Sequence, residues 1–396
     1  MKKHIHLLTL VLLLFSCSPV HKILSSGQIK ETSFTEQIPF SFDYGVPIIK
    51  VNINGKNYNF LFDTGAATVI SPELKTLLNL ESVVKDKVHD SQGNTKEQDF
   101  VMIPSMKIGS LNFENIGAVV IDVRNIFEFK CMNYDGIIGA NQMAKAIWQI
   151  DYKNKMLTAT NSLSNLNISN NAQTIDFKPK GNQKTPIVAV KIGNKTSYVT
   201  FDTGATTDFN FAINNYKTEL TNFKEVQTIG NTGTGIYGGS KNTATSYIKI
   251  PSFNIGNIVL KNQIPTFTES ASNLMGNTFF KNYKIIIDWN TNKIYMANEV
   301  ELTDAKLENF GIGFRYINNK PIVAKIYKNS DAEKNGLLLN DQVIAIDGKD
   351  TSNFTDEQAC YYAFNNILKG KESASITILR NDKKLTYQLK RNVVLD

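Results

Sequence analysis

Two segments of this chain are nearly identical, and each ends in the same Asp-Thr-Gly triplet. Residues 46–67 read VPIIKVNINGKNYNFLFDTGAA, and residues 185–206 read TPIVAVKIGNKTSYVTFDTGAT. The two strings align without a gap, so that Asp63 and Asp202 occupy the same place in each copy. An internal repeat of this kind predicts two copies of one structural unit.

Each copy has the pattern of a β-hairpin that delivers the triplet. Apolar residues alternate in the first half of each copy, at Ile49, Val51, Ile53, Val188, Val190 and Ile192. Asn54-Gly55 and Gly193-Asn194 follow, and these residue types tolerate the positive φ of a tight hairpin turn. The second strand of each hairpin therefore runs directly into Asp-Thr-Gly.

The repeat continues beyond the hairpins. The matched pairs are IPSMKIG at 103–109 with IPSFNIG at 250–256, GIIGAN at 136–141 with NLMGN at 273–277, and a closing strand pair at 148–159 with one at 285–297. These matches predict two β-rich lobes, residues 38–160 and 174–298, joined by a polar, turn-rich linker at 161–173.

Two aspartates that meet at a lobe interface have a specific chemistry. Two carboxyl groups a few ångströms apart cannot both ionise, so they share one proton. One then accepts a proton from a bound water while the other donates a hydrogen bond to a substrate carbonyl oxygen. This hydrolysis needs no metal and no cofactor, and we expect neither. Asp63 and Asp202 are the predicted catalytic residues.

The residues that follow each aspartate suit the same role. Gly65 and Gly204 let the two backbones approach closely and leave space for water and substrate. Thr64 and Thr203 can hydrogen-bond across the interface and hold the two loops in register. We expect these four residues to support the active site.

The paired motifs resemble those of the aspartic proteases. FDTGA at 62–66 and IIGAN at 137–141 are closer to the retroviral type than to pepsin, which usually has Ser after the Gly. Retroviral enzymes carry one motif per chain, whereas this chain carries two, as pepsin does. The resemblance covers residues 38–298 and implies an all-β bilobal aspartic protease fold, one active site per chain and a monomer.

The resemblance also implies a flap, a glycine-rich hairpin that closes over substrate. DSQGN at 90–94 and NTGTGIYGG at 231–239 lie at matching places in the two lobes. Gly93, Gly233 and Gly235 are therefore flap candidates, and the alternative is an ordinary hairpin tip.

The C-terminal segment, residues 303–393, resembles a PDZ domain of α+β type. The match rests on FGIGF at 310–314, SDAEKNGL at 330–337 and DQVIAIDG at 341–348. In PDZ domains a Gly-rich loop offers backbone N–H groups to a C-terminal carboxylate, and the peptide adds as a strand to the sheet edge. The corresponding loop residues are Gly311, Ile312, Gly313 and Phe314. The alternative is a folded spacer that binds nothing.

The N-terminus has the pattern of a targeting segment. Lys2 and Lys3 precede a short apolar run that fits a secretory signal at 1–17 and is too short to span a bilayer. The run ends in LFSC, which resembles the lipobox of bacterial lipoproteins, so Cys17 is the predicted lipidation site. Residues 18–37 then read as a tether, although a propeptide role stays open. The expected location is the bacterial cell envelope, or the periplasm or exterior if the signal is simply cleaved.

Composition excludes several other classes of protein. The net charge of +7 is scattered, with no run of five or six like charges, so nucleic acid is not an expected partner. The chain has 3 Cys and 4 His, and they form no zinc-like cluster. Cys131 and Cys360 lie far apart in the sequence, and the sequence does not predict a disulfide.

The leading hypothesis is a lipid-anchored aspartic endopeptidase that cleaves peptide or protein substrates and carries a PDZ module for a peptide or C-terminus. The alternative is a catalytically inactive, peptide-binding envelope lipoprotein in which the PDZ domain is the functional part. A third hypothesis, a receptor or structural envelope protein, does not account for two intact Asp-Thr-Gly motifs.

Overall fold

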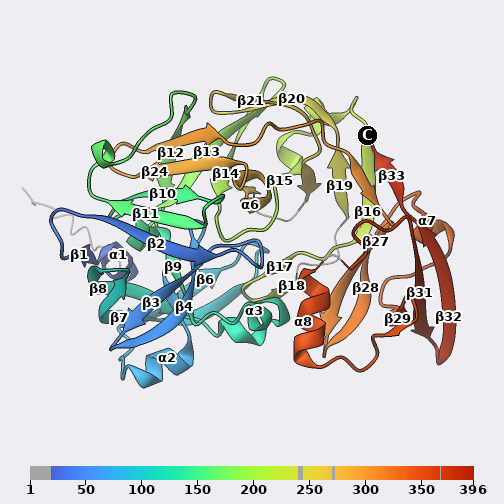
Figure 1. The fold of residues 1–396 in the computed structure, drawn as a ribbon, viewed down its shortest axis with the longest axis horizontal. Helices are drawn as coiled ribbons and strands as arrows, with labels where there is room; N and C mark the ends of the chain where they lie inside the picture. The colour runs from blue at the N-terminus through green and yellow to red at the C-terminus, as the bar shows by residue number, and fades with distance from the viewer. Residues whose placement is uncertain (1–18, 240–243, 270–272, 366) are drawn as a thin grey trace, which may run out of the picture.

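The computed structural model describes residues 19–239, 244–269, 273–365 and 367–396. It consists of two β-rich lobes and a third, C-terminal domain beside them (Figure 1). The predicted signal segment and Cys17 lie outside the described residues. Within the described ranges, no helix is long and apolar enough to cross a membrane.

Lobe 1 is built on the first predicted hairpin. Its strands are β3 (Ile48–Ile53), β4 (Lys56–Asp63), β5 (Val69–Ile70), β6 (Val84–His89), β7 (Thr95–Ile108), β8 (Leu111–Val120) and β9 (Gly136–Gly139). Its helices are α2 (Pro72–Leu77), η1 (Val123–Asn125), α3 (Phe127–Met132) and α4 (Ala140–Met143). The β3–β4 turn has positive φ at Asn54 and Gly55, which confirms the predicted hairpin.

Lobe 2 repeats this arrangement. Its strands are β13 (Thr185–Ile192), β14 (Lys195–Phe201), β15 (Phe209–Ala212), β16 (Glu225–Gly230), β17 (Thr234–Gly235), β18 (Gly238–Gly239), β19 (Thr245–Ile248), β20 (Ile250–Ile255), β21 (Ile258–Gln263), β22 (Thr266–Thr268) and β23 (Leu274–Met275). Its helices are η3 (Ile213–Asn215), α5 (Lys217–Leu220) and α6 (Asn277–Phe280). The parallel pairing of β4 with β9 recurs as that of β14 with β23, so the repeat seen in the sequence is a repeat of structure.

A six-stranded antiparallel sheet joins the two lobes. Its order is β2 (Thr35–Ser41), β11 (Met156–Thr160), β10 (Ile147–Asp151), β24 (Tyr283–Asp288), β25 (Lys293–Asn298) and β12 (Gln173–Lys180), and η2 (Leu163–Asn165) lies in the linker. Trp148 of lobe 1 pairs with Ile287 of lobe 2, and both are fully buried. One continuous hydrophobic core spans both lobes, so their relative position is fixed by packing.

Residues 19–37, the described part of the segment predicted to be a tether at 18–37, pack on lobe 1. Helix α1 (Pro19–Ser25) buries Ile23 and Leu24 against lobe 1, and β1 (Gln28–Ile29) pairs with β8. Gly117 of β8 allows this approach, because a Cβ there would lie 1.8 Å from the carbonyl oxygen of Ile23. In so short a segment, the alternation of apolar and polar residues is too weak a signal to predict that the segment packs on lobe 1.

The C-terminal domain is an α+β unit with its own core. Its strands are β26 (Leu307–Asn309), β27 (Ile312–Ile317), β28 (Lys320–Tyr327), β29 (Gln342–Ile346), β30 (Lys349–Asp350), β31 (Ser373–Arg380), β32 (Lys383–Lys390) and β33 (Asn392–Leu395). Its helices are α7 (Asp331–Lys334) and α8 (Asp356–Phe364). Thr355 and Gln358 form a capping box that fixes the start of α8.

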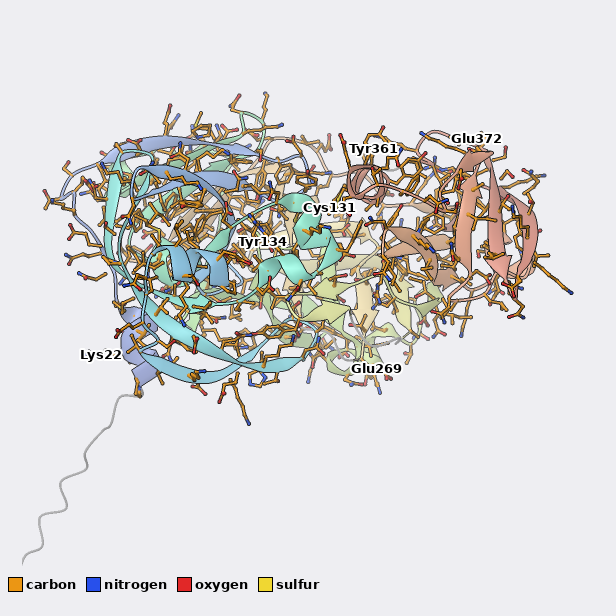
Figure 2. All side chains as sticks on the ribbon, turned by 90° about the horizontal axis from the view of Figure 1, so that it is seen from below. Lys22, Cys131, Tyr134, Glu269, Tyr361 and Glu372 are labelled. Carbon is orange, nitrogen blue, oxygen red and sulfur yellow. A yellow bond between two sulfur atoms is a disulfide. The ribbon has the colours of Figure 1, made fainter. Side chains whose placement is uncertain are left out.

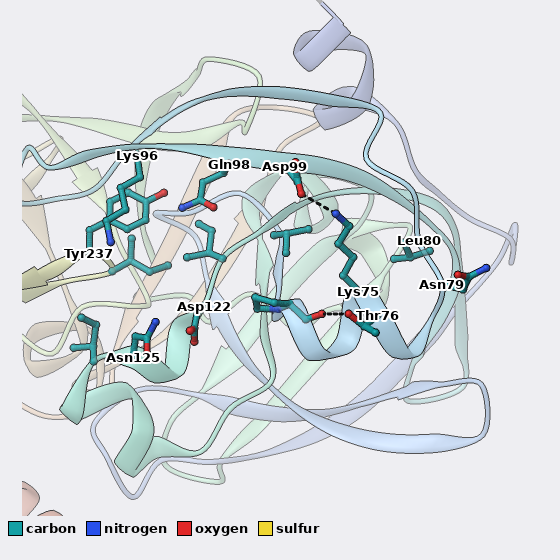
Figure 3. A pocket seen from close by; sticks show the side chains of 15 residues that line it. Lys75, Thr76, Asn79, Leu80, Lys96, Gln98, Asp99, Asp122, Asn125 and Tyr237 are labelled. Carbon is teal, nitrogen blue, oxygen red and sulfur yellow. Dashed lines mark hydrogen bonds and ion pairs between the residues drawn. The ribbon is translucent and has the colours of Figure 1, made fainter.

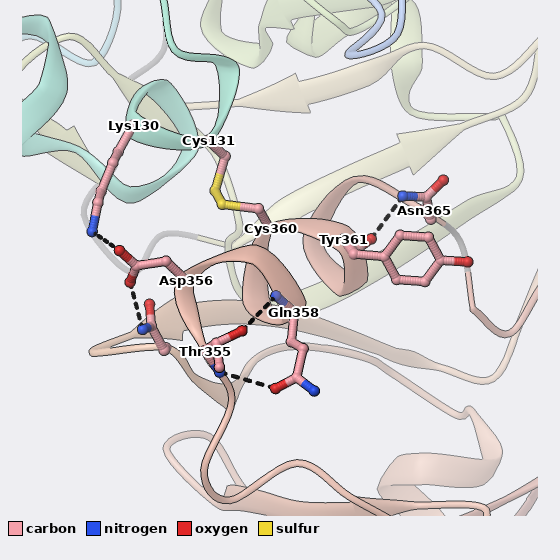
Figure 4. Close-up of a disulfide and its surroundings, with 9 residues drawn as sticks. Lys130, Cys131, Thr355, Asp356, Gln358, Cys360, Tyr361 and Asn365 are labelled. Carbon is pink, nitrogen blue, oxygen red and sulfur yellow. Dashed lines mark hydrogen bonds and ion pairs between the residues drawn. A yellow bond between two sulfur atoms is a disulfide. The ribbon is translucent and has the colours of Figure 1, made fainter.

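A shared strand and a disulfide are two of the connections between this domain and the lobes. Residues 225–227 of β16 pair with β19 in lobe 2, and residues 228–230 pair with β28, so one strand passes from the lobe-2 sheet into the C-terminal sheet. The second connection is a disulfide between Cys131 on α3 and Cys360 on α8, with Cα atoms 5.4 Å apart (Figure 4). Figure 2 shows Cys131 where lobe 1 meets the C-terminal domain. The sequence did not predict this disulfide.

Candidate active site

The structure brings Asp63 and Asp202 together on the floor of a cleft between the lobes. The cleft has a volume of about 530 Å³, and both carboxyl groups line it. Phe62 and Phe201, which precede the aspartates, are fully buried and pack on Trp148 and Phe280 with ring centroids 4.9 and 4.0 Å apart. Burial of each phenylalanine contributes roughly 1.5–3 kcal/mol, which anchors the strand ends that carry the aspartates.

The two threonines interlock the lobes in a symmetric pattern. The N–H of Thr64 donates to Oγ1 of Thr203, and the N–H of Thr203 donates to Oγ1 of Thr64, both at 3.0 Å. Each hydroxyl then donates across the interface, Thr64 to the carbonyl of Phe201 and Thr203 to the carbonyl of Phe62. Both threonines are fully buried, so every one of these groups needs its partner.

The two glycines lie against the aspartates of the opposite lobe. A Cβ on Gly65 would lie 2.6 Å from the carboxyl carbon of Asp202, and one on Gly204 would lie 2.3 Å from Oδ2 of Asp63. Each glycine N–H also donates to the aspartate of its own loop, at 2.7 Å for Asp63 and 2.8 Å for Asp202. No residue larger than glycine fits at either position.

Burial raises the pKa of both aspartates, and the closeness of the pair raises that of Asp202 further. Burial raises the pKa of Asp63 above the ordinary aspartate value, although hydrogen bonds from Gly65 and Asp202 oppose this. Burial and the charge of Asp63 raise the pKa of Asp202 further, well above that value. The pair therefore holds a proton more readily than an ordinary aspartate does, and the larger upward shift is that of the Asp202 pKa.

Two asparagines that sequence reasoning did not assign hold the aspartate loops. Asn141 accepts hydrogen bonds from the N–H and hydroxyl of Thr68, at 2.8 and 2.9 Å. Asn277 donates to the carbonyls of Thr203 and Ala205, at 2.7 and 3.0 Å. Asn277 directly follows Gly276, whereas Asn141 stands two residues after Gly139, so the two asparagines are not at equivalent positions and the repeat gave no signal for them.

The flap candidates lie in two hairpins that meet above the dyad. Residues 88–92 of lobe 1 and residues 231–236 of lobe 2 line the cleft, and Gly233 and Gly235 are among them. Oδ2 of Asp90 accepts a hydrogen bond from the N–H of Tyr237 at 3.2 Å, which joins the two hairpins. Gly93 is at the β6–β7 turn with φ +82° and does not line the cleft, so its role is to shape the turn.

A second cavity of about 520 Å³ lies beside the β6–β7 hairpin of lobe 1 (Figure 3). It is lined by α2, by β7 and by Tyr237, and Ile236 lines both this cavity and the cleft. Lys75 pairs with Asp99 across it at 2.7 Å, which holds the pKa of that carboxyl below its usual range. We assign this cavity no chemistry.

The predicted PDZ loop lies at the start of β27, next to lobe 2. Gly311 has φ +80°, and a Cβ there would lie 2.1 Å from Oγ of Ser330, so this position requires glycine. Ile312, Gly313 and Phe314 begin β27 and pair with β28. A Cβ on Gly313 would lie 3.3 Å from Cγ2 of Thr232 in the lobe-2 flap hairpin, so the loop and the flap are neighbours.

Side chains from the lobes and the C-terminal domain meet beside this loop. Phe127 of α3 stacks on Tyr316 of β27 with ring centroids 5.1 Å apart, and it packs near Ala359 of α8. The space between β27 and α8, where a PDZ domain takes a peptide, is thus contacted by lobe 1. Arg315 donates to the carbonyls of Asn231 and Gly233 at 3.1 and 3.3 Å. None of these contacts could be predicted from the sequence.

The two lobes with their paired aspartates resemble the aspartic protease fold, and an α+β domain follows them. Comparison with family models agrees, because residues 49–141 match the aspartyl protease model and residues 309–390 match the PDZ domain model. The chain therefore contains an aspartyl protease domain followed by a PDZ domain. Comparison with curated proteins finds no match. The first match covers lobe 1, and the assignment of lobe 2 rests on the repeat and its geometry.

Proposed function

We propose that this protein is an aspartic endopeptidase that hydrolyses peptide bonds with a water activated by Asp63 and Asp202. The observation that carries the proposal is the pair of aspartates on the floor of one cleft, each against the glycine of the opposite loop. Asp63 accepts a proton from the attacking water, and Asp202 donates one to the carbonyl oxygen of the scissile bond. The resulting tetrahedral diol collapses as the C–N bond breaks: the proton on Asp63 passes to the leaving amine, and a hydroxyl of the diol returns a proton to Asp202.

Support for a cleft that binds extended peptides comes from the two hairpins above the dyad. An extended peptide has free N–H and C=O groups that hydrogen-bond to such strands. The contact between Asp90 and Tyr237 must open to admit a chain and then reform over it. Closure excludes water and strengthens the electrostatic effect of the pair.

The alternative, a peptide-binding protein without activity, is favoured by the PDZ domain, since PDZ domains generally bind peptide or protein partners. We propose that its partner is a peptide or a C-terminus that binds beside Gly311–Phe314. Attachment to the bacterial envelope through Cys17, and a monomeric state, are part of the same proposal.

The endopeptidase proposal is tested by a digest of a peptide library and of denatured proteins, from acidic to neutral pH. The mature wild-type protein should release new peptide termini, a pepstatin-like inhibitor should block this, and the Asp202→Asn variant should release none. If the Asp202→Asn variant cuts the same bonds as the wild type, the aspartic mechanism is wrong. If neither protein cuts at any pH, the peptide-binding alternative is favoured.

The raised pKa values predict a pH dependence of stability that needs no activity assay. Both carboxyl groups hold their proton more tightly in the folded protein than in the unfolded chain, where an aspartate titrates at about pH 3.9. The free energy of unfolding therefore falls as pH rises from about pH 4 through the folded-state values. Asp202→Asn removes the larger of the two shifts, so the variant should gain stability relative to the wild type across this window.

Urea unfolding of both proteins at a series of pH values measures this difference. Asp382→Asn, at an exposed position in the C-terminal domain, is the matched control and should track the wild type. A stability difference between Asp202→Asn and wild type that stays constant with pH would contradict the raised pKa of Asp202.

A further inference from the structure

The two halves of the cleft differ in polarity at equivalent positions. The equivalence follows from strand register: Val69 on β5 pairs with Ile137 on β9, and Asn210 on β15 pairs with Leu274 on β23. All four line the cleft. Where lobe 1 presents valine to the cleft, lobe 2 presents an amide.

The same difference recurs at the next two positions. Val69 pairs with Val119 on β8, and Asn210 pairs with Thr266 on β22, so Val119 and Thr266 are equivalent. Two residues further along, Ile121 lines the cleft in lobe 1 and Thr268 lines it in lobe 2. Three apolar positions in lobe 1 are thus polar in lobe 2, and a pseudo-symmetric fold does not require this.

The PDZ domain adds to the apolar half of the cleft. Phe364, at the end of α8, lines the cleft and packs on Tyr44 with ring centroids 4.9 Å apart. Phe129, Met132 and Tyr134 line the same half. The lobe-1 half is therefore suited to a large apolar side chain.

The PDZ domain also places a cation in the polar half. Lys325 on β28 lines the cleft, and its Nζ lies 3.1 Å from the hydroxyl of Tyr247. The ammonium group also lies over the rings of Tyr247 and Tyr327, 5.6 and 5.2 Å from their centroids. Among the described residues, no ion pair joins Lys325 to a carboxylate. A half-buried ammonium held by aromatic rings is a good partner for a ligand carboxylate.

The carboxylates that line the cleft are engaged elsewhere. Asp90 accepts from N–H groups of its own turn and of Tyr237, and Glu128 accepts from the hydroxyl of Thr234. Asp63 and Asp202 form the dyad. The positive charge of Lys325 thus faces the polar half of the cleft without a protein carboxylate paired to it in the described part of the chain.

We propose that this cleft selects peptides with a large apolar side chain in the lobe-1 half and a carboxylate in the lobe-2 half, where Lys325 pairs with it. The proposal rests on the endopeptidase function above and names its substrate class. The carboxylate belongs to an Asp or Glu side chain or to the C-terminus of the substrate. Gly313 of the PDZ loop lies beside Lys325, with Cε 3.0 Å from the position of a Cβ, so either source reaches this place.

The test compares cleavage by the wild type, by Lys325→Met and by the control Lys328→Met. Lys328 is exposed, follows β28 and bonds to Gln227. Matched peptides carry Glu or Gln on the side bound by lobe 2, with an amidated C-terminus, and a third carries Gln with a free terminal carboxylate. The wild type and the control should favour a carboxylate peptide about tenfold in kcat/KM, mainly through KM, and Lys325→Met should lose this preference.

The outcomes separate this proposal from the one that it rests on. Preference for the Glu peptide assigns the carboxylate to a side chain, and preference for the free terminus assigns it to the chain end. Equal cleavage of all peptides by the wild type, or a preference unchanged in Lys325→Met, overturns the proposal. If the wild type cuts no peptide, or cuts only peptides that Asp202→Asn also cuts, the endopeptidase function fails instead. Calorimetric binding of the same peptides then tests the pairing of Lys325 with a carboxylate. If a carboxylate peptide binds Lys325→Met more weakly than it binds the wild type, the pairing is supported; equal binding to both overturns it.

Discussion

Replacing either aspartate of the dyad with asparagine should lower kcat/KM on the best library peptide on the order of 10⁴-fold, and replacing both should lower it little further. The reason is that the two carboxyl groups act as one unit with one shared proton. Once Asp63 or Asp202 is neutral and cannot ionise, the remaining carboxyl group cannot both accept the proton of the water and donate to the carbonyl oxygen. Steady-state kinetics of the two single variants and the double variant measure this.

The non-additive result is the informative part of this experiment. Asp43→Asn is the control, because Asp43 is exposed and pairs only with Lys155 at the surface. It should leave kcat/KM unchanged. If the loss in the double variant equals the product of the two single losses, the aspartates act independently and the shared-proton mechanism is wrong. Urea unfolding should show that all of these variants remain folded.

Removing the disulfide with Cys131→Ala and Cys360→Ala should lower the free energy of unfolding by about 5 kcal/mol. The disulfide closes a loop with a sequence separation of 229 residues, and loop-closure entropy of the unfolded chain grows with the length of the loop. Alanine is preferable to serine, because Cys131 is buried and a hydroxyl there would lack a partner. Urea unfolding followed by circular dichroism measures the loss.

A reductant provides the matched control for this variant. Reduction should destabilise the wild type to the level of the double alanine variant and should leave that variant unchanged. The nearby pair of Lys130 and Asp356 is exposed on both sides, and Lys130→Met should cost less than about 1 kcal/mol. Equal stability of the oxidised wild type and the double alanine variant would show that the cross-link does not constrain the unfolded chain as expected.

The sequence predicted the parts of the fold that local patterns specify. The hairpins before Asp63 and Asp202 follow from alternating apolar residues and from turn residues that tolerate positive φ. The predicted roles of Thr64 and Thr203 agree with the hydrogen bonds that cross the interface. These predictions were possible because the two copies of the motif can be aligned, and the alignment shows which residues occupy equivalent positions.

Contacts between distant segments could not be predicted. Cys131 and Cys360 approach each other only because α8 docks on α3, and no local pattern encodes that docking. Lys325 and Phe364 belong to the PDZ domain by sequence, yet both line the cleft between the lobes. Gly93 lies at the β6–β7 turn, next to residues 88–92 that line the cleft, and its direction could not be predicted because it depends on how the strands twist and pack.

Strand β16 has a consequence for any attempt to use the lobes alone. Its second half, residues 228–230, finds its hydrogen-bond partners in β28 of the PDZ domain rather than in lobe 2. In a chain that ends after lobe 2, the backbone N–H and C=O groups of residues 228–230 would be unpaired and would form an exposed sheet edge. The side chain of Ile229, which is already exposed, lies on this edge. Such an edge invites pairing with another copy, so the PDZ domain also protects the protease lobes from aggregation.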